Sequence, residues 1–193
     1  PESMSSTKTK QILRSFIVVP MIATSLSLSS FTASIDQFIA AQADDSQTSQ
    51  ERALQVEREE KAAKIDAYFA KSNMPLAGNG MKMVVEAEKN GLDWRLIPAI
   101  AVRESTGGRF ACKRFPENAW GWHSCKAGLG GSTQKAIELI AQHLGGNHPK
   151  TARYYEDKDT NEEILRTYNP PSVVPTYAQE VISLMNKIQE VQI

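Results

Sequence analysis

Apolar residues recur at helical spacing through most of this chain, and turn-forming residues separate the periodic stretches. Spacings of three and four residues place side chains on one face of an α-helix. Pairs such as Asn90-Gly91, Gly107-Gly108 and Gly145-Gly146 end successive stretches, because glycine adopts the left-handed conformation that closes a helix. No stretch alternates as a half-buried strand would. The pattern therefore predicts a mainly α-helical domain at residues 61–193.

Caps and breaks place the individual helices. We expect helices over about 61–73, 81–89 and 94–104, one starting after Ser132, one after the capping box Thr160 to Glu163, and one near Pro175. Pro98 either kinks the first turn of the third helix or marks its start. Residues 107–131 hold glycines, aromatics and both cysteines without a period, which predicts a long structured loop. A small β-hairpin within 109–131 stays open.

The amino-terminal end differs in kind from the rest. Lys8, Lys10 and Arg14 precede an apolar stretch at 16–28 that contains Pro20 and several serines. A basic head followed by a short apolar stretch is typical of a secretion signal, and the stretch is shorter than the roughly 20 apolar residues of a bilayer span. We therefore expect an export segment at 1–43, then a polar linker at 44–60 that acts as a spacer. Thr32-Ala33-Ser34 and Ala41-Gln42-Ala43 both offer a cleavage site. The expected location is secreted or in the cell envelope, with membrane contact only through an uncleaved N-terminal segment.

Charge and composition exclude several classes of partner. Lys plus Arg and Asp plus Glu number 22 each, so no excess charge is present to attract nucleic acid. Hydrophobic residues make up 41%, as in soluble globular proteins. His123, His143 and His148 show no metal-ligand spacing, so we expect no metal and no cofactor. We expect a monomer.

The two cysteines, Cys112 and Cys125, follow the export segment and would meet an oxidising environment. We predict a disulfide between them; two free thiols are the alternative. Zinc would need more ligands than these cysteines and His123 supply.

Glu104 occupies an unusual helical position. Ile97, Ile100, Ala101 and Glu104 lie at relative positions 0, 3, 4 and 7, which puts the carboxylate on the stripe that faces the core. Burial raises a glutamate pKa and so favours a proton donor near neutral pH, which glycoside cleavage requires. The alternative, which spacing alone favours, is a solvent-exposed helix end at which Glu104 pairs with a neighbouring cation, namely Arg103, Arg109 or Lys113.

Three segments resemble lysozyme-like transglycosylases and bacterial glucosaminidases. Residues 100–108, with the helix-ending Glu104-Ser105, resemble the motif that carries the catalytic glutamate in both families. Asn118-Ala119-Trp120-Gly121-Trp122 is similar to the Asn-x-Phe-Gly-hydrophobic segment of the glucosaminidases. Tyr168-Asn169, with the later Val174 and Tyr177, is similar to the transglycosylase segment Tyr-Asn-x-Gly, although Pro170-Pro171 departs from it. The Met-Gln pair of the transglycosylases is absent, so the choice between the families stays open.

The resemblance implies a lysozyme-like fold and an enzyme that cleaves β-1,4 bonds between N-acetylglucosamine and N-acetylmuramic acid in peptidoglycan glycan strands. Glu104 would be the catalytic acid, and Tyr168 would donate a hydrogen bond to it or to the substrate. Ser105, Asn118, Trp120, Trp122 and Asn169 would bind substrate. For each tryptophan a core position is an equal alternative, and Ser105 would alternatively bond local backbone.

A second carboxylate is harder to assign. Hydrolases use a partner carboxylate, and Glu117, Asp157 and Asp159 are available without a spacing argument for any of them. A transglycosylase needs none, because a substrate hydroxyl attacks. A wall-binding module that kept the fold and lost activity is the alternative function.

Overall fold

The computed structural model describes residues 32–193, with side chains from residue 49 onward. The chain divides into two compact units, residues 1–45 and 46–193. Most of the expected export segment, residues 1–31, lies outside the described residues. Within the described part, no helix is long and apolar enough to cross a membrane.

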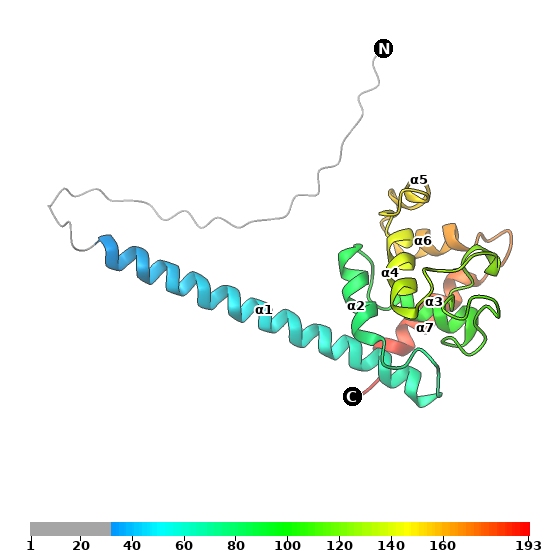
Figure 1. The fold of residues 1–193 in the computed structure, drawn as a ribbon, viewed down its shortest axis with the longest axis horizontal. Helices are drawn as coiled ribbons and strands as arrows, with labels where there is room; N and C mark the ends of the chain where they lie inside the picture. The colour runs from blue at the N-terminus through cyan, green and yellow to red at the C-terminus, as the bar shows by residue number, and fades with distance from the viewer. Residues whose placement is uncertain (1–31) are drawn as a thin grey trace, which may run out of the picture. The chain divides into compact units, whose positions relative to one another are not determined.

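The described chain is helical, as the sequence predicted. The elements are α1 Thr32–Lys71, α2 Gly80–Lys89, α3 Leu96–Ser105, η1 Trp122–Cys125, α4 Thr133–Leu144, α5 Ala152–Tyr155, α6 Asn161–Tyr168 and α7 Tyr177–Gln189 (Figure 1). Between residues 32 and 193 there is no strand, so the hairpin left open at 109–131 does not form. Residues 44–60, expected as a polar linker, are helical and continuous with α1.

Helix α3 is the centre of the 46–193 unit. It packs against α7, α2 and α4. Leu96, Ile97 and Ile100 are fully buried, and every residue from Leu96 to Ala101 belongs to the buried set. The first six residues of α3 are apolar, so this part of the helix is buried on all sides. Complete burial of each isoleucine stabilises the fold by roughly 1.5–3 kcal/mol, so α3 is a rigid platform for the residues at its C-terminal end.

Local sequence signals fix the helix ends. Ser132 accepts a hydrogen bond from the backbone N–H of Lys135, and Thr160 with Glu163 forms the predicted capping box. Helix α3 begins at Leu96, so Pro98 lies in its first turn, where its missing N–H costs little. At the other end Thr106 and Gly107 have φ values of 54° and 61°, which terminate α3 just after Ser105. Glu104 therefore lies in the last turn of the central helix.

Candidate active site

Glu104 lines a cavity of about 550 Å³ at the C-terminal end of α3. The wall comes from three parts of the chain besides α3. These are the disulfide loop (Gly121, Trp122, His123, Ser124), the α5 region (Thr151, Tyr154, Tyr155) and the end of α6 (Thr167, Tyr168, Asn169). Aromatic side chains on several sides of one carboxyl group make this cavity the candidate site.

The Glu104 carboxyl is half-buried and makes no ion pair with any residue from 49 to 193. Of the cations suggested by the sequence, Arg103 pairs with Glu180 at 2.6 Å and Arg109 donates to the carbonyl of Ser72. Burial raises the pKa of Glu104 above its ordinary value, while the Tyr177 hydrogen bond and the charge of Arg103 oppose that rise. The expected partial burial of Glu104 is therefore confirmed, and its role as a proton donor stays a prediction.

Tyr177 is the hydrogen-bond donor to Glu104. Its hydroxyl lies 2.6 Å from Oε1 of the carboxylate, and its side chain is buried at the first turn of α7. Tyr177 belongs to one of the motif segments, but the motif resemblance predicted this role for Tyr168. Sequence spacing did not identify it, because the contact depends on how α7 packs against α3.

Tyr168 instead donates to the carbonyl of Trp120, and its ring stacks on that of Tyr177 at a centroid distance of 5.8 Å. Of the two hydrogen bonds predicted for Tyr168, the one to Glu104 is therefore absent from this structure, and the one to the substrate stays a prediction. Tyr168 still lines the cavity, and it holds the backbone next to Gly121.

Gly121 lies directly against the acid. Its φ is 62°, and a Cβ placed on it would lie 3.1 Å from Oε2 of Glu104. Both the backbone conformation and the space favour glycine at this position.

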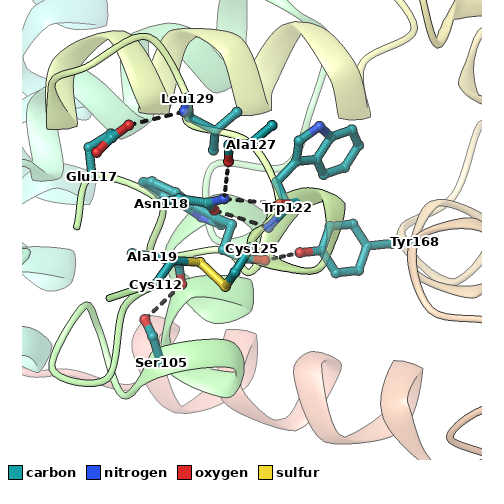
Figure 2. The surroundings of a disulfide bond; sticks show 11 residues. Ser105, Cys112, Glu117, Asn118, Ala119, Trp122, Cys125, Ala127, Leu129 and Tyr168 are labelled. Atoms are coloured by element: carbon teal, nitrogen blue, oxygen red, sulfur yellow. Dashed lines mark hydrogen bonds between the residues drawn. A yellow bond between two sulfur atoms is a disulfide. The ribbon is translucent and has the colours of Figure 1, made fainter. Parts of the chain in front are cut away.

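The predicted disulfide between Cys112 and Cys125 is present, with a Cα–Cα distance of 5.4 Å. Asn118 stabilises the same loop through side-chain hydrogen bonds (Figure 2). Its Nδ2 donates to the carbonyls of Trp122 and Ala127, and its Oδ1 accepts from the N–H of Trp122. Asn118, predicted to bind substrate, is fully buried and instead positions Trp122.

Ser105 and Trp120 are likewise buried supports. Ser105 Oγ lies 2.7 Å from the carbonyl oxygen of Ala119 and accepts from the N–H of Gly108, which is the local-backbone alternative. Trp120 is 0% exposed, and its Nε1 donates to the carbonyl of Ile97, so it is a core residue that no sugar can reach. The buried motif residues therefore hold the loop in place, and Trp122 is the motif tryptophan that lines the cavity.

Trp122 is half-buried and lines the cavity, as does Asn169. The ring of Trp122 stacks on His143 at 4.6 Å. Trp122 Nε1 and Asn169 Oδ1 are the two buried side-chain polar atoms, among the described residues, that lack a hydrogen-bond partner. Such unpaired atoms are rare in native structures, so both are candidate polar contacts for a bound molecule.

His143 supports Trp122 from the core side. Its ring also packs on His148 at 3.9 Å, and its Nδ1 lies 2.8 Å from Thr151 Oγ1. Burial, with the nearby charges of His148, His123 and Lys150, lowers the pKa of His143 to about 4. This role of His143 was not predicted from the sequence, although His143 follows Ile140 by three residues and so belongs to the apolar stripe of α4.

The three carboxylates considered as partners of Glu104 do not line its cavity. Glu117 accepts from the N–H of Leu129, Asp157 pairs with Lys158 at 2.6 Å, and Asp159 lines a separate cavity. Among the side chains described from residue 49 onward, Glu104 alone brings a carboxylate to the cavity wall. The side chains described from residue 49 onward contain no group of three or more His, Cys, Asp or Glu that could hold a metal.

Comparison with family models, with curated proteins and with solved structures found no match to this chain. The candidate site therefore has to be interpreted from its own geometry and from the motif resemblances.

Proposed function

We propose that this protein is a peptidoglycan-cleaving glycosidase that cuts β-1,4 bonds between N-acetylglucosamine and N-acetylmuramic acid, with Glu104 as the acid. The observation that carries the proposal is the half-buried Glu104 carboxyl, whose pKa is raised by burial and which faces a cavity with aromatic walls. A glycosidic oxygen is a poor leaving group until it is protonated, so this cleavage needs such a proton donor. The ordered resemblance of three segments to lysozyme-like enzymes supports the same chemistry.

The cavity wall suits an amino sugar. Trp122 and Tyr154 offer aromatic surface on which a pyranose ring can pack. Trp122 Nε1 lacks an acceptor and Asn169 Oδ1 lacks a donor. An acetamido group brings both a carbonyl and an N–H, so an N-acetylated sugar can pair both atoms after a small adjustment of the wall.

The proposed reaction starts with the proton on Glu104. The proton moves to the glycosidic oxygen, the C1–O bond breaks, and its electron pair stays on the departing oxygen. A hydroxyl attacks C1 of the resulting oxocarbenium-like centre and returns its proton to the Glu104 carboxylate. Because the lining residues offer no second carboxylate, we favour attack by a hydroxyl of the substrate, which yields an anhydro sugar, over attack by water.

Digestion of purified peptidoglycan by the protein and by its Glu104→Gln variant tests the proposal, with the fragments identified by mass. We expect cleavage by the first and a loss of about 100- to 10,000-fold in the second, which is the usual contribution of a general acid. Anhydro ends would support the internal hydroxyl, and reducing ends would support water. If neither protein cleaves any wall chemistry while both bind it, the protein is a wall-binding module instead.

A further inference from the structure

Three exposed cations lie in or directly after the disulfide loop, close in sequence to residues that line the candidate site. Lys113, Arg114 and Lys126 are all exposed, and none pairs with an acid among the side chains described. Arg109, at the start of the loop, differs because its guanidinium bonds the backbone of Ser72. We call Lys113, Arg114 and Lys126 the cationic loop.

The disulfide gathers these charges in space. Lys113 and Lys126 each follow a bonded cysteine, and the Cα atoms of Cys112 and Cys125 are 5.4 Å apart. Because consecutive Cα atoms are about 3.8 Å apart, the two lysine Cα atoms lie within about 13 Å of each other. Both side chains are long and exposed, so the two ammonium groups can reach the same anionic partner.

The cationic loop is continuous with the cavity wall. The N–H of Lys126 donates to the carbonyl of His123, and His123 and Ser124 line the cavity with Glu104. Lys126, and Lys113 through the disulfide, therefore lie within a few residues of the cavity wall. Many other cations of the described part are neutralised in the fold, for example Arg58 by Glu88 and Arg95 by Asp93.

We infer that the cationic loop binds the carboxylate-bearing stem peptides attached to the glycan strand in the cavity. This inference rests on the proposed function and adds a substrate requirement: strands with their peptides bind better than bare strands. Charge complementarity supports it, since the chain as a whole is neutral and these unpaired cations stand beside the site. Stem peptides place free carboxylates a short distance from the sugar backbone, whereas bare glycan offers the loop no charge to pair.

Binding of the full chain to peptidoglycan strands coupled to beads through their sugars tests the inference, because strands coupled in this way stay on the beads when their peptides are removed. The substrates are purified peptidoglycan free of phosphodiester polymers, and the same material after an amidase has removed the stem peptides. The test variant is Lys113→Gln with Arg114→Gln and Lys126→Gln. The matched control is Arg52→Gln with Lys71→Gln and Lys187→Gln, which removes three exposed cations that also lack ion pairs and do not line the cavity.

We expect the test variant to bind intact peptidoglycan about tenfold more weakly than the wild type, as three weak surface ion pairs would predict. The control should bind like the wild type, and a variant with Lys113→Arg and Lys126→Arg should retain affinity. On peptide-free strands all four proteins should bind alike, and added salt should remove the difference on intact material.

The inference is overturned if the test variant and the control bind intact peptidoglycan equally, or if the test variant loses the same factor on both substrates. A charge effect seen only on walls that still hold phosphodiester polymers would also overturn it. Cleavage is read separately with the Glu104→Gln variant. Failure of the proposed function would therefore leave the binding difference measurable.

Discussion

The hydroxyl of Tyr177 donates a 2.6 Å hydrogen bond to Oε1 of Glu104 across 73 residues of sequence. The contact joins the first turn of α7 to the last turn of α3, the helix on which α7 packs. A donor at this atom orients the carboxyl and favours its ionised form, while burial favours the protonated form. Tyr177 is thus a positioning residue for the proposed acid.

Tyr177→Phe keeps the ring and removes the hydrogen bond. Because that bond lowers the pKa of Glu104, its loss should raise the pKa further and move the alkaline limb of the rate profile to higher pH. We expect kcat to fall about tenfold as the carboxyl loses its orientation. The measurement is kcat against pH for both proteins. A fall in kcat without any shift of the limb would mean that Tyr177 supports only the fold.

The raised pKa of Glu104 links stability to pH. The folded carboxyl holds its proton to a higher pH than the unfolded one, so the folded protein loses stability as pH rises through this window. Glu104→Gln abolishes that loss. We expect the variant to gain stability relative to the wild type on going from pH 4 to pH 8, as measured by urea unfolding. A constant difference across that range would contradict the raised pKa.

His143 makes the stability of the fold depend on pH in the opposite direction. Its pKa is lowered to about 4 in the fold, against an ordinary value of 6.5, so stability is lost as pH falls from 6.5 toward 4. A shift of this size corresponds to about 3 kcal/mol below pH 4. His143→Phe keeps an aromatic ring against Trp122 and should flatten the pH dependence between 7 and 4.5. The free energy of unfolding of both proteins, measured at both pH values, tests this. An unchanged pH dependence would argue against a buried neutral imidazole.

Gly121→Ala tests the space beside the acid, and Gly131→Ala is its matched control. Both glycines have positive φ, at 62° and 76°, so each alanine should cost about 1–2 kcal/mol of stability. Only at position 121 does the new Cβ meet Glu104, since nothing lies within 4 Å at position 131. We expect loss of activity in the first variant alone, measured as kcat/KM. Equal losses in both would assign the effect to backbone strain.

Removing the Cys112–Cys125 disulfide with a double serine variant should lower the free energy of unfolding by about 3 kcal/mol, as expected for a loop of this size. It should also weaken substrate binding, because the loop carries Trp122 and the cationic loop residues. Chemical denaturation and co-sedimentation measure the two effects. A variant that is less stable yet binds normally would show that Asn118 alone maintains the wall.

Much of the helical pattern could be predicted from local signals. These signals act between neighbouring residues, so they can be recognised in the sequence. Examples are the caps at Ser132 and Thr160, the helix end at Gly91 and the apolar stripe of α3. Short α5 was missed because four residues carry too little periodicity, and the early start of α1 was missed because its polar residues show no apolar stripe.

The sequence by itself determined that this chain is mainly helical, that Cys112 can pair with Cys125, and that Glu104 stands on the core-facing stripe at a helix end. Only the tertiary structure decided that Tyr177 rather than Tyr168 bonds the acid, that Asn118, Ser105 and Trp120 are buried supports, and that Glu104 alone supplies a carboxylate to the cavity. The reason is physical. Periodicity and caps are properties of adjacent residues, whereas hydrogen-bond partners and burial depend on which helices meet and at what rotation.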